Sequence, residues 1–61
     1  MLQYLKEETD ELILQKLPVR VVYRDGDTLH VAWATTPTGD QERFLRDDFF
    51  ADDTVVFEAA R

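Results

Sequence analysis

An alternation of apolar and polar side chains through residues 18–36 constrains the fold more than any other feature of the sequence. Large apolar side chains recur at every second position on both sides of a turn sequence, Asp25-Gly26-Asp27. Successive side chains of a β-strand point to opposite faces, so this pattern predicts a β-hairpin with one apolar face. That buried face is expected to consist of Val19, Val21, Tyr23, Leu29, Val31 and Trp33.

The length of the hairpin loop decides the register of the two strands. Only a loop with an odd number of residues places both sets of large side chains on the same face. We therefore expect a three-residue loop at 25–27. A two-residue loop at 25–26 would instead set Val21 opposite His30. The expected cross-strand pairs are Tyr23 with Leu29, Val21 with Val31, and Val19 with Trp33.

The segment before the hairpin has the periodicity of an amphipathic helix over residues 2–17. Acidic residues stand early in this segment, Lys16 stands late and Pro18 ends the pattern, as the helix dipole favours. One alternative is a shorter helix over residues 10–17, N-capped by Thr9, and another is a strand that contains the alternating Leu12 and Leu14. The apolar stripe of the longer helix consists of Leu2, Leu5, Leu12, Ile13 and Leu17.

The chain after the hairpin contains two further strand candidates. Residues 37–40 have the composition of a turn, and residues 41–46 are predicted to form a short strand. The acidic stretch 47–53 is expected to form a turn or one helical loop anchored by its phenylalanines. A last strand is expected over residues 54–58.

These elements predict a single α+β domain over residues 1–61, in which an N-terminal helix packs on a four-stranded antiparallel meander. The alternative is a small SH3-like β-barrel with an added helix.

The barrel alternative is supported by a resemblance that covers residues 22–50, about half of the chain. This stretch resembles the strand and turn order of Tudor-like and other SH3-like barrels, with the glycine expected after the second strand displaced to Gly39. The resemblance implies a barrel fold and transfers no function. The residues that carry it are Asp25-Gly26-Asp27, Val31-Ala32-Trp33, Glu42-Arg43-Phe44 and Asp48-Phe49.

The size and charge of the chain limit what it can bind. With 61 residues and no cysteine, the chain lies near the lower limit for independent folding and has no disulfide to help it, so a homodimer would add useful burial. Thirteen acidic against seven basic residues leave a net charge of −6 and no basic cluster for phosphates, so no nucleic acid is expected as a partner.

Membrane insertion is not expected either. The longest apolar runs are far too short to cross a bilayer, and the opening residues Met-Leu-Gln-Tyr do not form the basic start of a secretory signal. We therefore predict a cytoplasmic protein.

Residues suited to catalysis or metal binding are scarce. The chain has neither serine nor cysteine, and its single histidine, His30, is predicted on the more polar face of the hairpin near Val22, where we interpret it as structural. No catalytic residue, metal site or cofactor is expected. The acids that cap and solvate turns, and that fit no metal-binding loop, are Asp25, Asp27, Asp47, Asp48, Asp52 and Asp53.

Apolar residues left outside the predicted core point to a binding surface. Tyr4 and Leu14 fall outside the main stripe of the helix, and two adjacent phenylalanines, Phe49 and Phe50, cannot both point inward from an extended segment. We predict a non-enzymatic, homodimeric interaction module that docks on or regulates a larger protein, and we expect these four residues to form a surface used either for self-association or for the partner. The alternative is a small ligand-binding or enzyme-accessory subunit with a pocket between helix and sheet.

Overall fold

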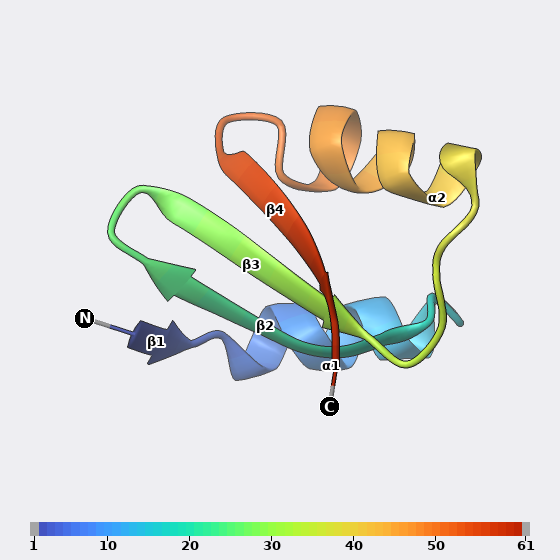
Figure 1. Ribbon diagram of the computed structural model, residues 1–61, viewed down its shortest axis with the longest axis horizontal. Coiled ribbons are helices and arrows are strands. Elements are labelled where there is room, and N and C mark those ends of the chain that lie inside the picture. The colour runs from blue at the N-terminus through green and yellow to red at the C-terminus, as the bar shows by residue number, and fades with distance from the viewer. Residues whose placement is uncertain (1, 61) are drawn as a thin grey trace.

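The computed structural model describes residues 2–60 and contains one mixed sheet and two helical regions (Figure 1). In chain order the elements are β1 (Leu2–Tyr4), α1 (Lys6–Leu14), β2 (Val19–Asp25), β3 (Thr28–Trp33), α2 (Gly39–Arg43), the π-helical segment η1 (Phe44–Phe49) and β4 (Thr54–Ala59).

The four strands lie side by side in the order β1-β2-β3-β4 (Figure 1). The first two pairs are antiparallel, but β4 runs parallel to β3. The α+β class is therefore confirmed, whereas the all-antiparallel meander is wrong. The sheet is also open, with β1 and β4 at its two edges, so the SH3-like barrel does not form. Parallel pairing needs a crossover connection, which α2 and η1 provide.

The hairpin turn has two residues, Gly26 and Asp27, and Asp25 pairs with Thr28 across it. The predicted three-residue loop is thus wrong. Gly26 has a φ of 63°, and a glycine with positive φ at the first turn position is the arrangement of a type II′ turn. Such turns are favoured because their twist matches that of the flanking strands.

This turn moves two of the predicted core residues to the other face of the sheet. Val22 pairs with Val31 and is fully buried, whereas Val21 and Tyr23 are only half-buried. His30 lies opposite Tyr23 and projects from the other face than Val22, so its predicted position beside Val22 is wrong. The pairs Tyr23–Leu29 and Val21–Val31 are wrong.

A β-bulge between Val19 and Val21 restores the predicted pairing at the far end of the hairpin. The extra residue shifts the register by one, so Val19 again lies opposite Trp33, and both are buried.

The N-terminal helix is shorter than residues 2–17 and starts before residue 10. Leu2–Tyr4 instead forms β1, which pairs with the end of β2. Thr9 lies within α1 and is not its N-cap; the N-cap residue is Leu5. The helix ends at Leu14, and Lys16, two residues later, has a left-handed backbone with a φ of 62°.

Thr9 fixes α1 against the edge of β2 just beyond β1. Its hydroxyl donates to the Leu5 carbonyl at 2.7 Å and accepts the Val22 amide at 2.9 Å, while the Leu5 amide donates to the Val22 carbonyl. The backbone of Val22 is thereby satisfied where the neighbouring strand has ended.

Residues 39–49 are helical, so the strand predicted at 41–46 is wrong. Thr38 and Gln41 form a capping box, in which each side chain accepts the other's backbone amide. The helical path lets Leu45 and Phe50 enter the core, with Phe49 packed edge-on against Phe50.

One core joins the helices to the sheet. Leu12 of α1 and Leu45 of η1 are buried together with strand residues, and Trp33 stacks on Phe57 with ring centroids 4.5 Å apart. No helix formed by residues 2–60 is long and apolar enough to cross a membrane. The core consists of Leu12, Val19, Val22, Leu29, Val31, Trp33, Leu45, Phe50 and Val55.

Candidate functional site

Both helical regions pack on the same face of the sheet, which leaves the other face uncovered. Leu12, Leu45 and Phe50 reach the core on the face that carries Val22 and Val31. Side chains at the alternate strand positions therefore point away from the helices. We call this side the open face; its residues are Leu2, Tyr4, Val21, Tyr23, Asp25, Thr28, His30, Ala32, Thr54, Val56 and Glu58.

A row of large side chains crosses all four strands on the open face. The strand registers place Tyr4 beside Tyr23, Tyr23 beside His30, and His30 beside Val56. The rings of Tyr23 and His30 stack almost parallel, with centroids 4.7 Å apart. Tyr4 is 55% exposed and Val56 is 42% exposed. We call these four residues the ridge.

Glu58 forms a polar cluster beside the ridge. The Tyr23 hydroxyl donates to Glu58 Oε1 at 2.5 Å. Glu58 Oε2 lies 3.8 Å from His30 Nδ1, which is buried and has no hydrogen-bond partner among residues 2–60. The hydrogen bond to Glu58, partial burial and the negative charges of Glu58 and Asp25 raise the pKa of Tyr23.

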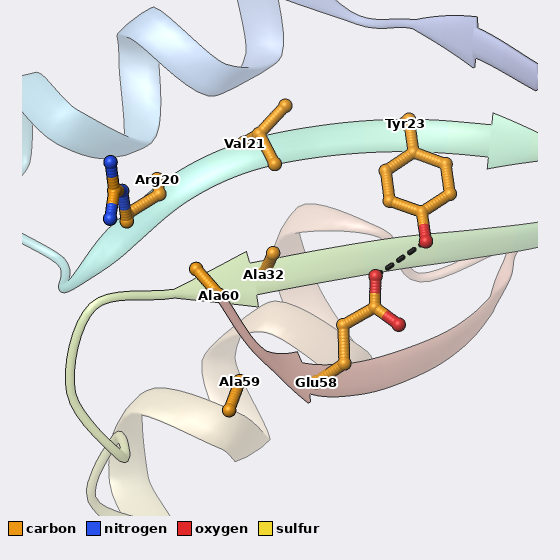
Figure 2. Close-up of a pocket in the computed structure, with 7 residues that line it drawn as sticks. All are labelled: Arg20, Val21, Tyr23, Ala32, Glu58, Ala59 and Ala60. Atoms are coloured by element: carbon orange, nitrogen blue, oxygen red, sulfur yellow. Dashed lines mark hydrogen bonds between the residues drawn. The ribbon is translucent and has the colours of Figure 1, made fainter.

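A shallow hollow of about 390 Å³ lies next to the ridge. Figure 2 shows Arg20 at one end of it and the Tyr23–Glu58 pair at the other, with Ala32 and Ala60 between them. The small side chains of the two alanines leave this space open. Within residues 2–60, the Arg20 guanidinium makes no ion pair or hydrogen bond.

A second hollow, of about 220 Å³, lies between the end of α1 and α2, where Leu17 and Phe44 line it. The two hollows thus lie on the open face and between helices, not between a helix and the sheet.

The structure does not gather the four predicted partner-binding residues on one surface. Tyr4 stands on the open face, whereas Leu14 is 81% exposed on α1. Phe50 is buried in the core, and Phe49 is half-buried against it. The adjacent phenylalanines are both accommodated because this segment is helical.

Sequence reasoning missed Leu2 and Val56 as exposed apolar residues of the open face. The signal was present for Val56, because Val55, Val56 and Phe57 form an apolar run that must place side chains on both faces of a strand. Leu2 fits the apolar stripe of the predicted helix over residues 2–17, so the sequence did not indicate that it lies in a strand.

The described residues offer no metal centre. Among residues 2–60, no three side chains of His, Asp or Glu are grouped in a way that would hold a metal ion. Asp53 of the acidic stretch is paired with Arg24, with a distance of 3.3 Å between Oδ1 and Nη1.

Fold and site together define a small α+β domain whose mixed sheet is covered on one face only. Searches with protein-family models, of curated proteins and of solved structures find no match to this chain.

Proposed function

We propose that this domain is a non-enzymatic interaction module that self-associates through its open face and, as a homodimer, docks on or regulates a larger protein. A cytoplasmic location remains a prediction.

The observation that carries the proposal is the character of the ridge. Where one face of a sheet is left to water, its side chains are usually polar. Here the uncovered face presents Leu2, Tyr4 and Val56, each more than 40% exposed, around the stacked rings of Tyr23 and His30. Contiguous exposed apolar side chains of this kind mark interaction surfaces.

The size of the chain supports a second copy as the partner. A domain of 61 residues buries a smaller share of its surface than a larger one, so it gains much from burial in a dimer. In a homodimer, the exposed apolar surface of each copy is buried by the other copy, so no different protein is required to cover it.

The test compares two exposed apolar residues that receive the same charge. We expect the parent chain to sediment as a dimer at high micromolar concentration. Tyr4→Glu should dissociate it, because a two-fold interface brings each introduced charge close to buried apolar groups of the other copy. Leu14→Glu, on α1, should leave the dimer intact.

A single species near 7.1 kDa at high micromolar concentration would remove the self-association proposal. Dissociation by Leu14→Glu but not by Tyr4→Glu would move the interface to α1.

The hollow supports a second candidate function, a small ligand-binding accessory subunit. Its opposite charges, Arg20 and Glu58, would suit a small zwitterion such as a free amino acid. A saturable rise in melting temperature with glycine or lysine, lost in Arg20→Gln, would favour this candidate over the dimer.

A further inference from the structure

Resting on the proposed self-association, we infer that two copies pack open face to open face about a two-fold axis. The hollow of each copy lies against the hollow of the other, and Arg20 of each copy pairs with Glu58 of the other.

The rows of the open face determine how two copies can meet. The ridge crosses the sheet in one row of cross-strand neighbours, and the adjacent row contains Val21, Ala32 and Glu58. The large side chains of the ridge thus lie next to a row that contains the small side chain of Ala32, and the hollow lies at this row. A two-fold axis at right angles to these rows sets the hollow of one copy against the hollow of the other and reverses the order of the strands, so the Arg20 end of one hollow meets the Glu58 end of the other.

The charges of the hollow are complementary to themselves. Arg20 and Glu58 line the same hollow from opposite ends without pairing within one copy (Figure 2). Glu58 Oε1 accepts from Tyr23, while Oε2 accepts no hydrogen bond within residues 2–60. A second copy, turned by the two-fold axis, brings a guanidinium to each carboxylate, and both charges gain a partner at once.

Charge distribution favours the open face over α1 as the contact between copies. The exposed side of α1 carries Glu7, Asp10 and Glu11, of which only Asp10 is paired, with Lys6, so two copies meeting there would oppose the remaining acids. The hollow carries one positive and one negative group. Because each copy has a net charge of −6, the contact needs such a locally balanced region.

The decisive experiment mixes two charge-reversed chains. Arg20→Glu places two acids in each hollow, and Glu58→Arg places two arginines there. Each variant alone should lose about tenfold or more in dimer affinity, because both contacts of its homodimer become repulsive. Mixed in equal amounts, the two chains restore both ion pairs and should form a heterodimer at the parent's affinity.

Native mass spectrometry distinguishes the heterodimer from either homodimer, and sedimentation equilibrium gives its affinity. Long-range attraction does not explain a recovery, because reversal changes the net charge from −6 to −8 in one chain and to −4 in the other, both negative. An ion pair formed within one chain does not explain the recovered affinity either, because neither chain carries both substitutions. Arg43→Glu mixed with Glu7→Arg, away from the open face, is the matched control and should leave each homodimer intact.

Glu58→Arg removes the acceptor of Tyr23, so its folding is checked by circular dichroism. If it does not fold, Arg20→Glu and Arg20→Lys decide the question, because both leave the Tyr23–Glu58 bond in place. The first should weaken the dimer about tenfold and the second should retain it.

A mixture of folded variants that stays monomeric would overturn the face-to-face arrangement. If Tyr4→Glu dissociates the parent dimer while Arg20→Glu has no effect, the proposed self-association is retained and the proposed ion pair between Arg20 and Glu58 is rejected. A monomeric parent removes both.

Discussion

At the scale of single residues, Thr9 shows how one hydroxyl joins two elements. It is 1% exposed, and it is the one polar residue among the fully buried side chains of residues 2–60. Its oxygen both closes the first turn of α1 and accepts the amide of Val22. A buried amide without an acceptor is costly, so this side chain holds the edge of β2 against the helix.

Replacing Thr9 by valine keeps the shape and removes both hydrogen bonds. We expect Thr9→Val to lower the free energy of unfolding by about 1–3 kcal/mol, because the Val22 amide stays buried without an acceptor. Urea unfolding measures the loss. Thr9→Ser keeps the oxygen and should be much closer to the parent; equal losses in both variants would show that packing, not hydrogen bonding, matters at this site.

Tyr23 gives the molecule a dependence on alkaline pH. Its pKa is raised above the ordinary value of 10.0, first by the hydrogen bond to Glu58, so the folded state favours the neutral phenol. The contribution to stability is therefore complete below pH 10 and is lost as pH rises through the raised pKa.

Melting temperatures measured from pH 8 to about pH 11 should fall at the alkaline end in the parent and less steeply in Tyr23→Phe. Tyr4→Phe, which leaves the Tyr23–Glu58 bond in place, should follow the parent. The pKa of Lys6 is also raised, by its hydrogen bond and ion pair with Asp10, and acts in the same direction. Both tyrosine variants are therefore compared in a Lys6→Gln background; identical curves there would refute the role of Tyr23.

At the scale of elements, the crossover between β3 and β4 decides the topology. Its helical start is specified locally by Thr38 and Gln41, whose spacing is that of a capping box. The helix then directs Leu45 and Phe50 into the core, and β4 enters parallel to β3. Arg46 continues this contact: its guanidinium donates to the Val55 carbonyl and lies 4.5 Å above the centroid of the Phe57 ring.

Removing the cap should weaken the crossover without changing the core. Thr38→Ala loses the acceptor of the Gln41 amide, and we expect a loss of about 1 kcal/mol in the free energy of unfolding. Thr36→Ala, at an exposed position just before the helix, is the matched control and should be nearly neutral. Equal effects of the two changes would mean that the capping box contributes nothing.

At the scale of the whole molecule, stability and association are linked. If folding and dimerisation are coupled, a higher concentration stabilises the folded state. A hundredfold increase in concentration should raise the melting temperature of the parent by roughly 10 °C. Calorimetry at two concentrations measures the shift. Tyr4→Glu should abolish the dependence on concentration, and a parent whose melting temperature stays constant would contradict a coupled dimer.

Local chemistry was enough to predict several elements. The alternation on both sides of Gly26 predicted the hairpin, Val19 opposite Trp33 was predicted and found, and a helix and a last strand were predicted near their observed positions. These features depend on neighbouring residues, whose side-chain period reflects backbone geometry directly. The capping box at Thr38 is an equally local signal, and it marks the start of the helix at 39–49, which the predicted strand at 41–46 did not take into account.

Tertiary structure decided the direction of β4 and the identity of the open face, whereas the local turn at Gly26 set the register of the hairpin. Phe50 and Tyr4 are both aromatic residues that the sequence places outside the predicted core. Phe50 is buried because its segment packs on the covered face of the sheet, whereas Tyr4 is exposed because no helix covers the other face. The two-residue turn shifted the register, and a bulge at Val19–Val21 corrected it, a compensation between distant parts of the hairpin. Which face is covered and which strands pair depend on contacts between segments far apart in the chain, and a one-residue shift in register changes the face of every side chain.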